Sequence, residues 1–332
     1  MARVDVQPFT DDDLDAAGAL LARRHAAHRR AVPLLTPRFE EVAEATREVA
    51  ELWKVDGASG AVGRRAGRLV GFLLGTPRSG NLWGPNVWVG PAGHAVEDPE
   101  TVRDLYAAAA ARWVDEGRTA HYAVVPASDA ALVDAWFRLA FGQQHVHGLC
   151  PAAPASAAPV EAAPVSAPPF SGFVIRRATR DDIQALAELD LVLPGHQALS
   201  PVFSAGEIPP IQEALAEWTE DIDDPAYTTF VAERDGVVVG SAVGCSVEKS
   251  RVHSGIARPD DAGLLGFAAV RPDARGHGLG SALGRAVMDW IAESGYRTAA
   301  TDWRATNLLS SRTWPRLGFR PSFLRLHRVV GY

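Results

Sequence analysis

Residues 270–283 read VRPDARGHGLGSAL. A predicted apolar strand over 264–270 runs into this stretch, and a predicted helix follows over 280–294 with apolar residues at helical spacing. The three glycines at 276, 278 and 280 therefore lie at a helix N-terminus, where backbone N–H groups and the helix dipole attract an anion. Arg275 adds a full positive charge that suits a diphosphate. The stretch predicts a phosphate-binding loop in an α/β domain.

Two common phosphate-binding motifs fit this loop poorly. A P-loop requires Gly-Lys-Ser/Thr, and the loop has no lysine. A dinucleotide-binding loop requires a third glycine where Ser281 or Leu283 stands. The glycine spacing therefore indicates a different class of phosphate ligand.

An Ala/Pro-rich run divides the chain near its middle. Residues 150–170 read CPAAPASAAPVEAAPVSAPPF, which has no periodicity and little apolar surface to bury. We expect a first domain over 1–149, a linker over 150–171 and a second domain over 172–332.

The two predicted domains resemble each other in the order of their patterns, which indicates a duplication. The matched segments are VQPFTDDDL (6–14) with IRRATRDDI (175–183), LVGFLLG (69–75) with VVGSAVG (238–244), and LVDAWFRLAF (132–141) with SSRTWPRLGF (310–319). The second copy alternates predicted strands at about 228–234, 237–247, 264–270 and 298–303 with predicted helices at about 181–190, 211–220, 280–294 and 308–316. Asp235 and Gly236 predict a hairpin turn between its first two strands.

Composition excludes several classes of protein. A formal net charge of −7 and a pI near 5.8 give no basic field for nucleic acid or an anionic membrane. The two cysteines, Cys150 and Cys245, form no disulfide framework and have no metal-ligand spacing. No apolar run is long enough for a membrane span. We expect a cytoplasmic protein without a metal, a nucleic-acid partner or a membrane partner.

The loop resembles the coenzyme A loop of the GNAT superfamily of N-acetyltransferases, which follows an apolar strand and a Val-x-Pro step. A second family segment supports this resemblance, because Asn307, Trp314, Gly318 and Phe319 occupy the places of its Asn, Tyr and Gly-Phe. The resemblance covers roughly residues 173–332. It implies an α/β (α+β) protein of two GNAT-like domains, the first degenerate, each with a mixed, mostly antiparallel sheet flanked by helices.

The resemblance also implies acetyl-CoA, or another acyl-CoA, as co-substrate. The pyrophosphate would lie on the amides of 276–281, and pantetheine would follow a strand that splays from its neighbour, with an oxyanion donor at Ala269 or Val270. Asn307 and Ser310 would face the pantetheine arm, or Asn307 would simply cap its helix. The implied binding residues are Phe267, Ala268, Ala269, Val270, Arg275, Gly276, His277, Gly278, Leu279, Gly280, Ser281, Asn307 and Trp314.

The corresponding segment of the first copy has carboxylates in place of arginine and glycines. Asp98 followed by Pro99 is a good start for a helix, so the helix terminus is satisfied by the protein itself. Glu97, Asp98 and Glu100 would also repel a diphosphate, at about 4 kcal/mol for one like-charge pair in close contact. We expect no coenzyme A binding at this place.

The predicted chemistry is direct attack of an amine on the thioester, and the usual acid is missing. Trp314 stands where the family has Tyr, and Pro315 follows it. A thiolate leaves tolerably without an acid, and Ser310 or Ser311 with a water could assist. For the base we consider Asp302, Glu248 and His253.

The leading prediction is a GNAT-type N-acetyltransferase that moves an acetyl or other acyl group to a primary amine of a small molecule. A protein or peptide amine is the second candidate acceptor. A non-catalytic acyl-CoA sensor or partner-binding module is the alternative class. We expect a monomer, as a pseudo-dimer of its two domains, or a homodimer.

Overall fold

The computed structural model describes residues 4–78, 84–152, 172–203 and 208–331. The chain divides into two compact units. Unit 1 contains Met1–His147, Ser254–Pro259 and Pro321–Tyr332, and unit 2 contains Gly148–His253 and Asp260–Arg320. None of the helices in the described part of the chain has the length and apolar character needed to span a bilayer.

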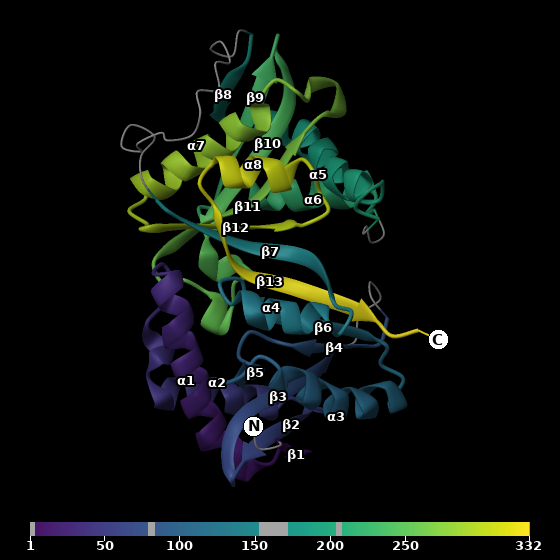
Figure 1. Cartoon of the computed structure of the whole chain (residues 1–332). Coiled ribbons are helices and arrows are strands. Elements are labelled where there is room, and N and C mark those ends of the chain that lie inside the picture. The colour runs from purple at the N-terminus through teal and green to yellow at the C-terminus, as the bar shows by residue number, and fades with distance from the viewer. Residues whose placement is uncertain (1–3, 79–83, 153–171, 204–207, 332) are drawn as a thin grey trace. The chain divides into compact units, whose positions relative to one another are not determined.

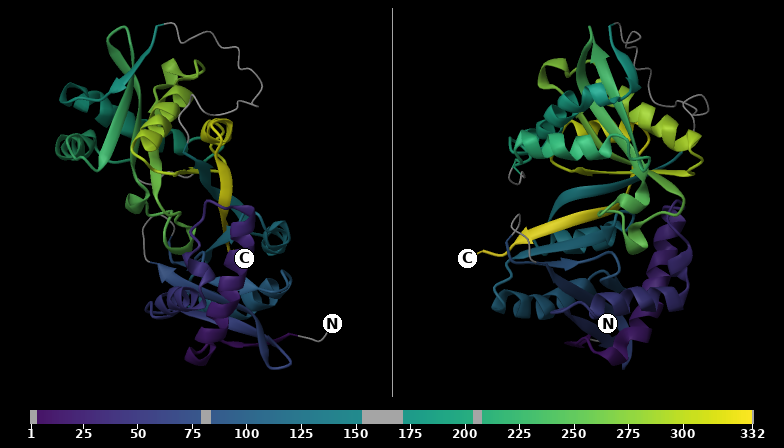
Figure 2. Two further views of the ribbon diagram at one scale, coloured as in Figure 1. Left: turned by 90° about the vertical axis from the view of Figure 1, so that its left-hand side faces the viewer. Right: turned by 180° about the vertical axis from the view of Figure 1, so that it is seen from behind.

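Unit 1 is a mixed, mostly antiparallel sheet with helices on its two faces (Figure 2). Apolar residues alternate along the central strand, so Phe72 packs with the first two helices and Leu73 packs with the third. The strands are β1 (Asp5–Pro8), β2 (Ser59–Arg65), β3 (Arg68–Arg78), β4 (Asn86–Val89), β5 (His94–Val96), β6 (Ala120–Pro126) and residues 142–147 of β7 (Gly142–Pro151). The helices are α1 (Leu14–Ala31), α2 (Val42–Trp53), α3 (Thr101–Asp115) and α4 (Ala130–Phe137).

The last strand of the chain, β13 (Arg320–Val329), belongs to unit 1 from residue 321 onward (Figure 1). It pairs antiparallel with β6, from Phe323 opposite Pro126 to Val329 opposite Ala120. Leu326 on this strand is fully buried in the core formed with α3 and α4. The two units are therefore not contiguous halves of the chain, because residues 321–329 satisfy the edge of β6. Most of the predicted linker, residues 153–171, lies outside the described residues.

Unit 2 has the same architecture, with α5 and α6 on one face of its sheet and α7 on the other (Figure 2). Val243 packs with α5 and α6, whereas a Cβ on the next residue, Gly244, would meet Val287 and Trp290 of α7. The strands are β8 (Val174–Arg177), β9 (Tyr227–Arg234), β10 (Val237–Ser246), β11 (Ala262–Val270) and β12 (Thr298–Arg304). The helices are α5 (Ile183–Gln197), α6 (Ile211–Asp221), α7 (Leu279–Glu293) and α8 (Ser310–Arg316). The predicted hairpin turn is confirmed, since Asp235 and Gly236 both have positive φ, 52° and 77°.

Matched local features confirm the duplication. A short 3-10 turn precedes α1 and α5 (Asp11–Asp13 and Arg180–Asp182), each with a Thr and Asp capping box. A register shift interrupts the β2–β3 and β9–β10 pairings at equivalent positions, Val70 and Val239. Gly75 of β3 lies against Trp113 as Gly244 of β10 lies against Trp290.

Candidate active site

The strands β11 and β12 separate part-way along unit 2. They pair in parallel over four residues, from Ala262 opposite Thr298 to Leu265 opposite Thr301. Beyond this point β11 keeps its pairing with β10 as far as Val270. The Thr301 hydroxyl donates to the Leu265 carbonyl at 2.9 Å, at the origin of the opening. The expected splay is therefore present, and it exposes one backbone edge of the segment from Phe267 to Val270.

The glycine loop joins the end of β11 to the start of α7. Gly276 and Gly278 adopt positive φ, 87° and 76°, and α7 begins at Leu279. Residues with a side chain rarely adopt a positive φ, so these two positions favour glycine. Within the described residues, the N–H groups of 276–280 donate to no protein acceptor. A Cβ on Gly280 would meet nothing within 4 Å, so the approach to these groups is open. The loop can therefore hold a diphosphate.

Arg275 is anchored at the side of this loop. Its Nε donates to the Val270 carbonyl at 3.1 Å, which ties the loop to the last residue of β11. Burial lowers the pKa of the guanidinium. Its two terminal nitrogens make no hydrogen bond to the described residues. The position fits the expected contact with a diphosphate.

Asn307 and Ser310 lie at the start of α8. The buried Asn307 Oδ1 accepts from the N–H groups of Leu309 at 3.1 Å and Ser310 at 3.4 Å. His196 Nε2 on α5 lies 3.2 Å from the same oxygen, and the Ser310 hydroxyl donates to the Asn307 carbonyl at 3.3 Å. These bonds are those of a helix cap, and a contact of Asn307 with pantetheine stays a prediction. Trp314 is buried, and its ring lies close to Gly284 of α7.

The candidate bases fall at two ends of β11. Asp302 follows Thr301 directly, and the fully buried His253 has Nε2 3.0 Å from the Thr301 carbonyl, so both lie at the origin of the opening. Glu248 is exposed and follows Ser246, which pairs with Gly263 near the opposite end of β11 from Val270. The structure thus brings Asp302 and His253 toward the splayed segment but not Glu248.

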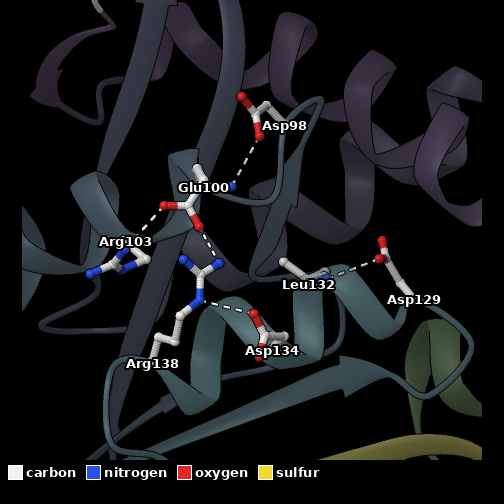
Figure 3. Close-up of polar contacts among 7 residues, drawn as sticks. All are labelled: Asp98, Glu100, Arg103, Asp129, Leu132, Asp134 and Arg138. Carbon is white, nitrogen blue, oxygen red and sulfur yellow. Dashed lines mark hydrogen bonds and ion pairs between the residues drawn. The ribbon is translucent and has the colours of Figure 1, made fainter.

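The counterpart of the glycine loop in unit 1 is closed by its own side chains (Figure 3). Asp98 Oδ1 accepts from the N–H of Glu100 at 3.1 Å, and the Asp98 carbonyl accepts from Thr101 at 2.9 Å. Glu100 is paired with Arg103 and with Arg138 of α4. Glu97 is paired with Arg68 and Arg23. The helix terminus is satisfied internally as expected, but arginines neutralise two of the carboxylates, so repulsion of an anion is weaker than the sequence suggests.

Residues 196–319 match the model of the acetyltransferase (GNAT) family. This match lies in the second half of the chain. Acetyl-CoA is the acyl donor that this family uses.

Solved structures support the fold of the whole chain. A GCN5-related N-acetyltransferase from Sphaerobacter thermophilus aligns over 100% of this chain and 98% of its own, with 14% identity and a TM-score of 0.56. A GCN5-related glucosamine N-acetyltransferase region of a fungal multi-domain β-N-acetylglucosaminidase aligns over 98% of this chain and 38% of its own, with 16% identity and a TM-score of 0.54. A tandem GNAT protein from the clavulanic acid biosynthesis pathway also aligns over 99% of both chains, with 17% identity, but its TM-score of 0.49 is too low to support the fold. The comparison with curated proteins returned no match.

Helix α5 is the part of the site that sequence reasoning missed. It supplies His196 beside Asn307, and Gln197 Oε1 accepts from Arg304 Nε at 3.0 Å. The predicted helix ended near residue 190, before both contacts, because Pro194 breaks the pattern. The run LAELDLVL (186–193) was a usable signal, since it places Asp190 on the apolar side of the helix.

Proposed function

We propose that unit 2 transfers an acetyl or other acyl group from acyl-CoA to a primary amine of a small molecule by direct attack. The observation that carries the proposal is that the glycine loop and the free strand edge adjoin each other. The unpaired N–H groups of 276–280 follow directly on the strand segment whose edge β12 leaves free. A diphosphate on the loop would place a pantetheine arm along Phe267 to Val270.

The thioester supplies an activated acyl group when acyl-CoA is bound. A backbone N–H of Ala269 or Val270 would then donate to the carbonyl oxygen as negative charge develops on it. The amine nitrogen forms the new C–N bond, the C–S bond breaks, and the sulfur leaves with the electron pair as a thiolate. A free thiol has a pKa near about 8.5, so the thiolate leaves without an obligatory acid. This is consistent with Trp314 in place of a proton donor.

A small-molecule amine is preferred over a protein or peptide amine as the acceptor. Small-molecule acceptors fit an opening bordered on one side by α5, which is tied to Arg304 and Asn307. We further infer a cytoplasmic location, because both cysteines, Cys150 and Cys245, are buried free thiols.

The test is release of free thiol from acetyl-CoA with a panel of amines, alongside direct measurement of acetyl-CoA binding, on the full chain. Gly278→Val should abolish binding and turnover, because Val is strained at φ 76° and blocks the loop. Gly295→Ala is the matched control, since Gly295 has φ 85° at the other end of α7 and is remote from the loop. Turnover that survives in Gly278→Val overturns the assignment of the site.

A non-catalytic acyl-CoA sensor is the second candidate, favoured by one observation. Trp314 replaces the family's acid and is buried close to Gly284. A sensor binds acetyl-CoA tightly but releases no thiol with any amine in the panel. An enzyme releases thiol with at least one of them.

A further inference from the structure

Helix α5 crosses the opening between β11 and β12. Its body packs on β10 and β11. Its last turn contacts the chain beyond the separation point of β12, through Gln197 with Arg304 and His196 with Asn307. A helix held at both sides of an opening borders the space in which an acyl thioester would meet its acceptor.

Asp190 lies on the side of α5 that carries its buried residues. It follows Leu186 and Ala187 by four and three residues, and both of these are fully buried. Gln197, which reaches Arg304, follows Asp190 by seven residues and shares its helix face. A carboxylate therefore interrupts an apolar stripe of α5, two turns before the residues that contact Arg304 and Asn307.

One oxygen of this carboxylate is held and the other is free. Trp218 Nε1 on α6 donates to Asp190 Oδ2 at 2.6 Å. Among the described residues, Oδ1 has no hydrogen-bond partner and Asp190 has no cationic partner. Asp182, eight residues earlier in the same chain segment, is paired with Arg176. A half-buried carboxylate without a countercharge is costly, which favours a cationic ligand beside it.

The electrostatic setting suits proton transfer near neutral pH. Burial raises the pKa of Asp190 to about 6, the Trp218 hydrogen bond lowers it, and the charge of Glu217 raises it. A base that titrates near the working pH accepts a proton and releases it again efficiently. The equivalent position in unit 1 is Leu21, if α1 and α5 are aligned on their capping boxes at Asp13 and Asp182.

We propose that Asp190 receives the acceptor amine: its Oδ1 binds the ammonium group and takes its proton, which frees the nitrogen lone pair to attack the thioester carbonyl. The inference rests on the proposed function. The proton passes from ammonium to carboxylate before the C–N bond forms, and the thiolate departs with the electron pair of the C–S bond. Asp190 thereby fills the role for which Asp302, Glu248 and His253 were considered.

The test is Asp190→Asn in the full chain, with an amine that the wild type turns over. We expect kcat/KM for the amine to fall about 10² to 10⁴-fold, the range of general-base help, while KM for acetyl-CoA stays unchanged. Glu188→Gln is the matched control, because Glu188 is an exposed carboxylate on the same helix that contacts only Gln184. It should leave every kinetic constant unchanged.

A second variant separates a catalytic from a structural role. Trp218→Phe keeps an aromatic, though smaller, side chain and removes the N–H donor that stabilises the charged carboxylate. The acidic limb of the kcat/KM profile should therefore move to higher pH, and in Asp190→Asn this limb should disappear. A limb that stays in place in both variants, with a wild-type enzyme that is active, overturns the assignment of Asp190 alone. A wild type inactive on every amine overturns the proposed function and this inference together.

Discussion

In both units two parallel strands separate part-way along their length. In unit 1 side chains fill the resulting opening, whereas in unit 2 it stays open. In unit 1, β4 and β6 pair in parallel over four residues, from Asn86 opposite Ala120 to Val89 opposite Ala123, as β11 and β12 do in unit 2. After this point β5 continues beside β3. The pairing of Leu73 with His94 and of Ala242 with Ala268 makes these two partners equivalent.

Side chains of unit 1 occupy its opening. His94 is fully buried, and its Nε2 lies 3.1 Å from the Val124 carbonyl on β6, so the ring spans the gap. Arg24 of α1 donates to the carbonyls of His94 and Pro91. The capping-box alignment makes Leu193 the equivalent of Arg24 in unit 2. The backbone of the duplicated fold thus persists in unit 1, while two polar side chains and a closed helix terminus occupy the place of a ligand.

The largest expected effect comes from placing in unit 2 a side chain like His94, which fills the opening of unit 1. In Ala268→His the imidazole would enter the opening between β11 and β12, as His94 does between β5 and β6. Acetyl-CoA affinity should fall at least about 100-fold, because the imidazole would take the place of part of the ligand. The loss of one set of ligand contacts costs about 3 kcal/mol. Isothermal titration with acetyl-CoA measures the change.

Ala268→Ser is the control for this substitution, since its side chain is too short to cross the gap. It should bind acetyl-CoA within about threefold of the wild type, a difference of under about 1 kcal/mol. Equal affinities for Ala268→His and the wild type would break the equivalence between the two openings.

A second effect is expected when Arg24, one of the two side chains that fill the opening of unit 1, is replaced. Arg24→Leu installs the residue of unit 2 and leaves two buried carbonyls without donors. Each such carbonyl costs about 1–3 kcal/mol, partly offset because a buried guanidinium, whose pKa burial lowers to about 10, is lost. We expect a net loss of about 2 kcal/mol in the free energy of unfolding, measured with urea.

The same variant also tests whether Arg24 alone prevents unit 1 from binding acetyl-CoA. Because the α3 terminus stays closed by Asp98, Arg24→Leu should still bind one acetyl-CoA per chain. Titration that reaches two per chain would show that Arg24 was the main barrier.

Periodicity and turn residues predicted most of unit 2. The strands β9 to β12 and helices α6 to α8 lie within a few residues of their predicted bounds, since each is bounded by glycine, proline or an Asp-Gly turn. The loop from Arg275 to Gly280 was visible because glycine spacing is a local property. The capping role of Asn307 was among the predictions, because its bonds to the start of α8 are local. The place of β13 was not, because its pairing with β6 joins residues remote in sequence.

The buried histidines of unit 1 predict a loss of stability in acid. Burial lowers the pKa of both His28 and His94 to about 3, whereas in the unfolded chain each titrates near about 6.5. Between these pH values the unfolded state binds more protons, so the free energy of unfolding falls as the pH drops below about 6.5. Each histidine should contribute a loss of about 2 kcal/mol between pH 7 and pH 5.

His28→Leu isolates one of these contributions. The His28 ring packs edge-on against Phe323, and its two nitrogens have no hydrogen-bond partner among the described residues. Its position corresponds to Gln197 of unit 2 in the capping-box alignment. The urea midpoint of the variant should depend less steeply on pH than that of the wild type. An unchanged slope between pH 7 and pH 5 would contradict the neutral state of His28.

The smallest expected effect is one in which the two units should behave alike. Thr10 and Thr179 occupy the same place in the two capping boxes, with their N–H groups donating to Asp13 at 2.9 Å and to Asp182 at 2.8 Å. Both hydroxyls also contact these carboxylates. Thr10→Ala and Thr179→Ala should each lower the free energy of unfolding by about 1 kcal/mol, the usual cost of a lost cap. Acetyl-CoA affinity should not change in either variant. Equal costs would show that the duplicated frame is energetically intact in both units, so that the difference between them lies in the side chains at the opening. A Thr10→Ala variant without any cost would instead mean that unit 1 has lost part of the frame as well as the site.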